Sequence, residues 1–180
     1  MTRTDGEDWA YAHVRRVLQL IDRIKDGVPH DAEVLTWAAY LHDWGAFRCY
    51  AQPDVPHAKR SRQVAEEEIL PDTHFSAAQR GILLEAIERH DYRDQLPVAS
   101  KEALLLREAD WLDMLGAIGI VRNFAWGPNN LRVCYERTER YRDSLQRRFE
   151  LPASREIAAR RIEQMNAILA QISDESFGFL

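Results

Sequence analysis

The sequence is poor in cysteine and lacks any long apolar run. Its 180 residues include two cysteines, Cys49 and Cys134, which form no CxxC pair. Such spacing favours reduced thiols in a cytoplasmic protein, while a single disulfide between the two stays open. No stretch of about 18 uncharged apolar residues occurs, and the opening "MTRTDGEDWAYAH" is polar and acidic rather than basic and then apolar. We therefore expect a soluble, cytoplasmic protein without a membrane span.

An excess of basic residues is also missing. The formal net charge at pH 7 is −5, with 24 lysines and arginines against 29 aspartates and glutamates. This balance argues against a protein that binds along a phosphate backbone, so we expect no nucleic-acid polymer as a partner. The basic clusters "HAKRSR" and "RYRDSLQRR" are interpreted mainly as solvated helix faces, and a small phosphorylated substrate fits the charge better.

Patterns typical of β-strands are absent, and apolar residues recur at steps of three and four, as in helices. A chain of this length is expected to form one domain whose core needs no disulfides. We predict an all-α, single-domain bundle of about six to seven helices. The helices are expected over residues 8–25, 32–44, 57–70, 77–91, 101–126, 131–149 and 153–172.

The segment 101–126 is apolar on nearly every face, which is typical of a helix at the centre of a bundle. Its "GAIGI" run has no strand before it, so the glycines are expected to allow close helix packing rather than to cradle a phosphate. Residues 45–56 contain two prolines and no clean period, which predicts an irregular loop.

Four polar residues are expected to face the interior from three of these helices: His13, His42, Asp43 and Asp110. A single inward histidine is more often a hydrogen-bonded core residue than a metal ligand. Two imidazoles and two carboxylates together, however, form a nitrogen and oxygen set suited to Mn, Fe, Co, Ni or Zn and less suited to Ca. Neighbouring helical residues point about 100° apart, so His42 and Asp43 reach one ion only near the helix end. Gly45 fits such an end.

The order of these residues resembles the HD-domain metal-dependent phosphohydrolases, whose motif is a His, a His-Asp pair and a distant Asp. "DWAYAHVRRV", "AAYLHDWG" and "READWLDMLGAIGIVRNF" are similar to the three helices that carry that motif. The resemblance implies an HD-type bundle with a metal-binding core over about 8–126 and scaffold helices over 131–172. It also implies one divalent ion (Mn, Ni, Fe, Co, Zn or Mg) on His13, His42, Asp43 and Asp110.

One subgroup with a similar closing helix includes pyrophosphohydrolases and phosphatases that act on nucleotides. That subgroup often has an arginine where this chain has Trp111. An aromatic residue thus replaces a cation that would meet a phosphate, which bears on the substrate more than on the metal site.

Two further histidines, His57 and His90, fall at expected helix ends between the His-Asp pair and Asp110. They suit either a second metal ion or hydrogen bonds to a substrate phosphate, and the sequence leaves both open. Asp113 lies three residues after Asp110, on the same helical face, where it would orient a ligand or accept a proton. It equally suits an ion pair with Arg107 or Arg122.

Substrate contacts are expected from several other residues. Lys59, Arg60 and Arg122 are candidates for neutralising the charge of a phosphate, and Trp44 for stacking on a base, although tryptophans at this spacing are also typical core residues. The final "SFGFL" is an apolar tail that suits docking on the bundle or on a second subunit in a homodimer.

These observations predict a divalent-metal-dependent phosphohydrolase for a small phosphorylated molecule, with a nucleotide as the best candidate. Metal-activated water would attack phosphorus. Two alternatives stay open: a di-iron oxygenase of the HD type, and a non-enzymatic module that binds a nucleotide signal and keeps the metal as a structural element.

Overall fold

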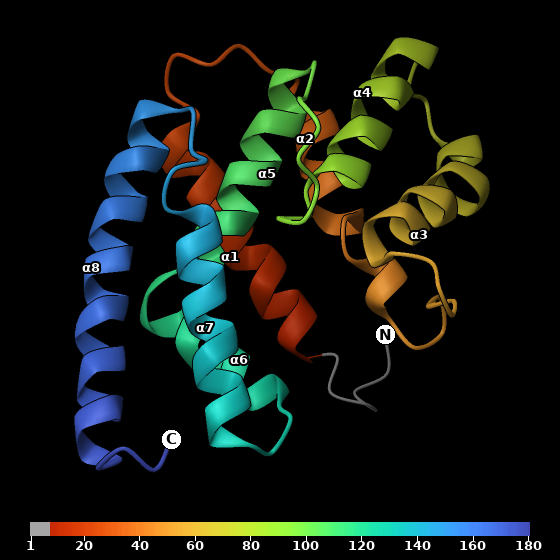
Figure 1. The fold of residues 1–180 in the computed structure, drawn as a ribbon. Helices are drawn as coiled ribbons and strands as arrows, with labels where there is room; N and C mark the ends of the chain where they lie inside the picture. The colour runs from red at the N-terminus through yellow and green to blue at the C-terminus, as the bar shows by residue number, and fades with distance from the viewer. Residues whose placement is uncertain (1–7) are drawn as a thin grey trace. The chain divides into compact units, whose positions relative to one another are not determined.

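The computed structural model describes residues 8–180, and this part of the chain is all-α, as predicted. Eight α-helices and no strand occur in it (Figure 1). They are α1 Asp8–Ile24, α2 Ala32–Leu41, α3 His57–Val64, α4 Ala77–Arg89, α5 Lys101–Asp113, α6 Gly116–Trp126, α7 Leu131–Leu145 and α8 Pro152–Glu175. The chain divides into two compact units, one ending at Asp110 and the other beginning at Trp111. No helix in residues 8–180 is long and apolar enough to cross a membrane.

The first unit contains α1 to α4 and most of α5. Figure 1 shows α3 beside α4 and α4 against α2, in agreement with the contacts between these helices. Side-chain N-caps fix the N-termini of α2 and α4. The Asp31 carboxylate accepts the backbone N–H groups of Glu33 and Val34, and Ser76 forms a reciprocal capping box with Gln79. The Gln79 amide also donates to Asp31 at 2.9 Å, so the two helix starts are tied together.

Helix α3 is shorter than the predicted 57–70 helix because its last turns change geometry. A π-helical turn, Ala65–Ile69, follows Val64, and a 3₁₀ turn, Leu70–Asp72, closes the segment. Pro71 lies in the second position of that last turn and supplies no N–H, so a regular helix does not continue through it.

The single helix predicted over residues 101–126 is wrong, because the chain turns between Asp113 and Gly116. The N–H groups of Met114 and Leu115 donate to carbonyls three residues back, and Gly116 takes a positive φ of 80°. That backbone conformation favours glycine. A Cβ added at Gly119 would lie 2.0 Å from the Met114 oxygen, so the second glycine lets the turn pack on the start of α6. The sequence does not reveal this turn, because apolar residues recur at helical spacing on both sides of it.

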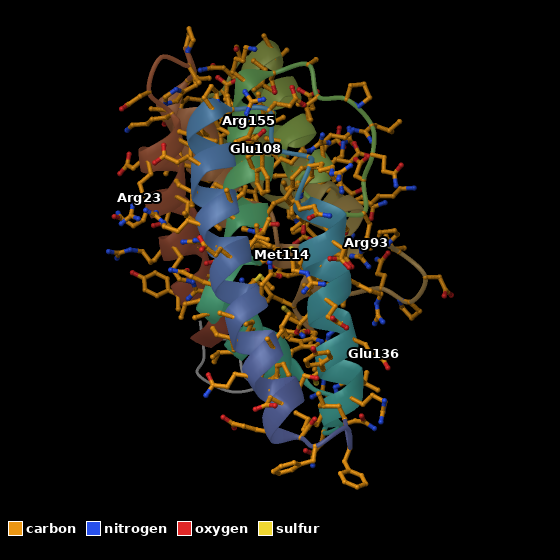
Figure 2. The ribbon with its side chains drawn as sticks, turned by 60° about the vertical axis from the view of Figure 1, so that its left-hand side comes forward. Arg23, Arg93, Glu108, Met114, Glu136 and Arg155 are labelled. Atoms are coloured by element: carbon orange, nitrogen blue, oxygen red, sulfur yellow. The ribbon has the colours of Figure 1, made fainter. Side chains whose placement is uncertain are left out.

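In the second unit, α6 packs on both α7 and α8. Gly116 faces the Arg161 side chain of α8, and Arg161 donates to the Leu112 carbonyl, so the expected close packing at the first glycine is present. Asn123 is buried and donates to the Cys134 carbonyl of α7. Many exposed positions of α7 and α8 carry charged residues, including Glu136 and Arg155, which are labelled in Figure 2.

Candidate metal centre

Three helices of the first unit bring the four predicted ligands together. His13 lies on α1, His42 and Asp43 directly follow α2, and Asp110 lies on α5. The His13 Nε2 atom is 3.1 Å from His42 Nε2, 3.1 Å from Asp110 Oδ1 and 3.5 Å from Asp43 Oδ2. His42 Nε2 lies 3.5 Å from Asp43 Oδ2 and 3.9 Å from Asp110 Oδ1. His13 and His42 are fully buried, so these atoms face the interior of the unit.

These spacings fit the ligands of one cation. An ion held about 2.1 Å from each ligand, at angles between tetrahedral and octahedral, places neighbouring ligand atoms about 3.0–3.4 Å apart. The separations in the structure, 3.1–3.9 Å, lie at or slightly beyond that range. A side-chain set of two imidazoles and two carboxylates is therefore compatible with a borderline divalent metal and needs little movement to bind it.

The helix end after α2 sets the orientation of His42. Its Nδ1 atom lies 2.8 Å from the Ala39 carbonyl oxygen. A carbonyl only accepts hydrogen bonds, so Nδ1 carries the proton and the Nε2 lone pair faces the cluster. His90 follows α4 in the same way, with Nδ1 2.6 Å from the Ile87 carbonyl oxygen. Both histidines thus use Nδ1 for a backbone carbonyl and turn Nε2 toward the cluster.

Asp43 connects this cluster to the two further histidines. Its Oδ2 atom faces His13 and His42, whereas its Oδ1 atom lies 3.4 Å from His57 Nε2 and 3.5 Å from His90 Nε2. The Nε2 atoms of His57 and His90 are 3.1 Å apart. The structure thus brings His57 and His90 beside the four predicted ligands, as a second half of one cluster that shares Asp43.

Burial and mutual charge shift the pKa values in this cluster. Burial lowers the pKa of His42 to about 4, which keeps its imidazole neutral. For Asp43, burial raises the pKa, but its electrostatic interaction with His42 and the hydrogen bond from His90 outweigh burial, and the pKa lies well below its usual range. The pKa of Asp110 is also lowered, because the hydrogen bond from His13 outweighs the effect of burial. The cluster therefore presents two carboxylates in their anionic form to a cation.

His90 shows the opposite shift. Burial lowers its pKa, but the hydrogen bond with Asp43 and the charge of Asp110 outweigh burial, and the net effect is a raised pKa. His90 therefore binds a proton more readily than a free imidazole does, because that proton interacts with the two carboxylates. A divalent cation would replace that proton, so metal binding should release protons.

Two residues that were not predicted from the sequence, Asp91 and Arg93, lie beside His57. The Asp91 carboxylate accepts the Arg93 backbone N–H at 2.9 Å and the Arg93 Nε–H at 3.0 Å, and it also accepts an Nη2–H. Arg93 Nη2 lies 3.2 Å from His57 Nδ1. The available signal was an acid two residues before a base, directly after His90, at the point where the predicted 77–91 helix ends.

Arg107 also has a role that its sequence position did not indicate. It is buried on α5 and donates Nε–H to the Arg89 carbonyl at 2.7 Å and Nη2–H to the Leu96 carbonyl at 3.0 Å. These carbonyls lie on either side of His90, Asp91 and Arg93. The helix that supplies Asp110 therefore also fixes the segment that supplies His90.

The predicted substrate-binding residues of the first unit lie near the surface. Lys59 is exposed on α3. Arg60 donates its Nε–H to the Tyr50 carbonyl at 2.8 Å, which fixes the 45–56 loop against α3. Trp44 is half-buried and stacks on Tyr50, with ring centroids 5.6 Å apart and planes 18° apart. One face of the indole is thus covered by protein.

Asp113 and Arg122 belong to the second unit, where they form an ion pair with each other. Asp113 is almost fully buried, and Arg122 donates to its Oδ2 atom. Of the two roles that the sequence left open for Asp113, the ion pair with Arg122 is therefore present. This pairing engages both the proposed proton acceptor and one of the proposed phosphate-binding cations.

A close approach of backbone segments positions His57. Gly45 lies two residues after Asp43, and a Cβ added there would be 2.3 Å from the His57 carbonyl oxygen and 2.5 Å from the Ser61 nitrogen. The glycine therefore allows the start of α3 to pack directly on the turn that follows the His-Asp pair.

The fold and this cluster define a class of helical proteins in which histidines and aspartates from separate helices bind a divalent metal. Residues 10–115 match the HD domain family, which is more than half of the chain, and the protein belongs to that family. The match contains all six residues of the cluster.

Solved structures resemble the chain over nearly its full length. A Lactobacillus plantarum protein has a TM-score of 0.71 at 18% identity, over 92% of this chain and 86% of that one. Bacillus subtilis YpgQ in complex with ADP has a TM-score of 0.68 at 20% identity, over 94% and 92%. An HD-superfamily hydrolase from Bacillus thuringiensis has a TM-score of 0.62 at 25% identity, over 96% and 87%. No curated protein matches the sequence.

Proposed function

We propose that this protein is a divalent-metal-dependent phosphohydrolase that acts on a small phosphorylated molecule, with a nucleotide as the best candidate. The observation that supports this most strongly is that His13, His42 and Asp110, and likewise His42, Asp43 and His90, bring their ligand atoms close enough together to hold a cation. Membership of the HD domain family and the likeness to an HD-superfamily hydrolase favour hydrolysis. The ADP bound to YpgQ favours a nucleotide as the ligand.

The residues around the cluster indicate from which side a substrate would enter. The side chains of His13, His42 and His90 are at most 2% exposed, whereas that of His57 is 26% exposed. Arg93 next to it is 60% exposed, and Lys59 lies on the same helix as His57. We therefore place the phosphate on the His57 side, where donors and positive charge are available to it.

The reaction is hydrolysis of a phosphoryl bond. When bound, the metal would supply Lewis acidity toward water and toward a phosphoryl oxygen. The chain itself would hold the anionic carboxylates of Asp43 and Asp110 as ligands and exclude bulk solvent around His13 and His42. The oxygen of water would bond to phosphorus while the bond from phosphorus to the leaving oxygen breaks, and His57 or His90 would meet the charge on the phosphoryl oxygens.

A direct test is incubation of the protein, loaded in turn with Mn, Ni, Fe, Co, Zn and Mg, with a panel of nucleotides and sugar phosphates. Release of phosphate or pyrophosphate with at least one metal is the expected result. Chelator-treated protein is the matched control and should be inactive. Absence of release with every metal and every substrate would reject the proposal.

A second candidate function rests on the two halves of the cluster. Asp43 faces a histidine pair with each of its oxygens, an arrangement compatible with two ions joined by one carboxylate. A di-iron oxygenase of the HD type would use it. Elemental analysis separates the candidates: two irons per chain together with oxygen consumption favour the oxygenase, and one Mn, Ni or Zn favours hydrolysis.

A further inference from the structure

Arg93 is a cation at the solvent-exposed side of the cluster. It lies on the connector after α4 and is labelled in Figure 2. Its Nη2 atom is 3.2 Å from Nδ1 of His57, the most exposed of the four cluster histidines. The Arg93 side chain itself is 60% exposed, so a ligand can reach it from solvent. A charged group of a ligand that extends outward past His57 would therefore meet this guanidinium.

Asp91 holds the Arg93 side chain in this position. Its carboxylate accepts the Arg93 backbone N–H at 2.9 Å, the Nε–H at 3.0 Å and an Nη2–H. The backbone bond fixes the turn, and the two side-chain bonds fix the direction of the guanidinium. The Arg93 Cζ atom also lies 5.6 Å from the centroid of the Tyr92 ring. A long side chain that is already ordered loses less conformational entropy when it binds a ligand.

The acid and the base of this pair differ in exposure. The Asp91 side chain is 9% exposed, whereas that of Arg93 is 60% exposed. The carboxylate is thus mostly covered by protein, and the guanidinium mostly faces solvent. A ligand that arrives from solvent therefore meets a positive group, although the pair as a whole is neutral.

The chemistry of this group suits a phosphate. A guanidinium presents several N–H donors in one plane, which match two oxygens of a phosphate, and its charge strengthens both hydrogen bonds. The arginines that the sequence predicted for this role are engaged elsewhere. Arg60 holds the 45–56 loop, and Arg122 forms an ion pair within the second unit. Arg93 instead contacts a histidine of the cluster, on the side where we place the phosphate.

We propose that Arg93 binds a phosphate group of the substrate and that Asp91 is the positioning residue that holds Arg93 for this role. The inference rests on the proposed function for the presence of a phosphorylated substrate, and it adds the pair of residues that recognises the phosphate. Asp91 acts through Arg93 alone and does not touch the substrate.

The binding test is isothermal titration calorimetry on the full chain, loaded with the ion that it retains most tightly in elemental analysis. The probes are α,β-methylene-ADP and methylenediphosphonate, which cannot be hydrolysed between their phosphorus atoms. In Arg93→Met the Kd of both probes should rise about ten- to a hundredfold, because a charge-assisted contact is lost. Arg93→Lys keeps the charge without the planar fork and should give an intermediate Kd. Arg89→Met, which removes an arginine paired with Asp94, is the matched control and should leave both Kd values unchanged.

The role of Asp91 is tested by a double-mutant cycle with the same probes. Asp91→Asn keeps the size of the side chain but removes its charge, and it should raise both Kd values about three- to tenfold. In the Arg93→Met background the same change should have no further effect, because Asp91 acts only through Arg93. A general structural role would lower the affinity equally in both backgrounds. With a hydrolysable substrate, Asp91→Asn should raise KM more than it lowers kcat.

Several results would overturn the inference. These are a wild type that binds neither probe, unchanged Kd values in Arg93→Met, or a loss confined to α,β-methylene-ADP, which would place Arg93 at the nucleoside. Additive losses in the double mutant would remove the role of Asp91. The titrations involve no turnover. A protein that shows the expected affinities but hydrolyses nothing would therefore contradict the proposed function alone.

Discussion

Gly45 donates its backbone N–H to the Ser61 hydroxyl across 2.8 Å. This bond joins the turn after Asp43 to the helix that begins with His57. Gly45→Ala should break it, because the new Cβ would lie 2.3 Å from the His57 carbonyl oxygen. We expect the free energy of unfolding to fall by about 1–3 kcal/mol, and His57 to move away from Asp43. Urea unfolding measures the first effect, and substrate KM measures the second.

Gly81→Ala is the matched control for that substitution. Gly81 is exposed within α4, and an added Cβ would meet nothing within 4 Å. The same chemical change should therefore raise the free energy of unfolding by about 0.5–1 kcal/mol, through helix propensity alone. If the two alanine variants behaved alike, the close approach at Gly45 would have no energetic weight.

Asp110→Ala should abolish tight metal binding and lower turnover by at least about a hundredfold, while the circular dichroism stays helical. The reason is that Asp110 Oδ1 lies 3.1 Å from His13 Nε2 and that Asp110 is the ligand candidate on α5. Elemental analysis and phosphate release measure the two losses. Asp22→Ala, at an exposed position of α1 that pairs with Lys25, is the control and should keep both. A fully active Asp110→Ala protein would remove the catalytic role of the cluster.

Removal of the metal should lower the thermal stability without unfolding the protein. The metal binds the native cluster and not the unfolded chain, so at about 100 times its Kd it contributes about 2.7 kcal/mol. Differential scanning calorimetry with and without chelator measures the shift in Tm. Adding back a divalent ion should restore it. Equal Tm values in both states would show that no ion binds the native cluster.

The lowered pKa of Asp31 should make the free energy of unfolding depend on pH, independently of the metal-binding cluster. The Gln79 amide and the backbone amides of Val34 and Glu33 hold the pKa of Asp31 below its usual range. A lowered pKa gives a stability contribution that is present above the ordinary value of about 4 and is lost as the pH falls through the folded value. Asp31→Ala should therefore cost about 1 kcal/mol at pH 7 and progressively less in acid.

Ser76→Ala is the matched control for that measurement. It removes the cap of α4 in the same unit, but a hydroxyl does not titrate in this range. Its loss, also about 1 kcal/mol, should stay the same between pH 7 and pH 3. Urea midpoints at several pH values compare the two variants, and a constant difference for Asp31→Ala would contradict the assigned hydrogen bonds.

The sequence predicted the helical class and the inward direction of the four ligand candidates, because both follow from periodicity. A helix repeats every 3.6 residues, so the positions of His13 and Asp110 within apolar stripes fix the side on which they lie. The resemblance to the HD family added the expectation that these residues meet. Distances between separate helices follow from packing, which a single sequence does not contain.

Arg93 could not be found in the same way. It lies in an irregular connector, where no period relates a residue to the core, and its importance depends on Asp91 and His57 lying beside it. The turn at Met114 escaped prediction for a related reason. Both α5 and α6 are apolar, so the hydrophobic pattern continues through the turn. The positive φ of Gly116 does not change that pattern, so hydrophobicity alone cannot reveal the turn.

Arg107 on α5 holds the connector between α4 and α5 at two points. It donates to the Arg89 carbonyl, where α4 ends, and to the Leu96 carbonyl. The segment that presents His90 and Arg93 therefore cannot detach by itself, since its release requires the middle of α5 to loosen as well. Opening of this region should be one cooperative event, in which amides of the connector and of α5 lose protection against solvent hydrogen exchange at the same rate. Thermal fluctuations would then leave the cluster either complete or disassembled, with few partly formed states between.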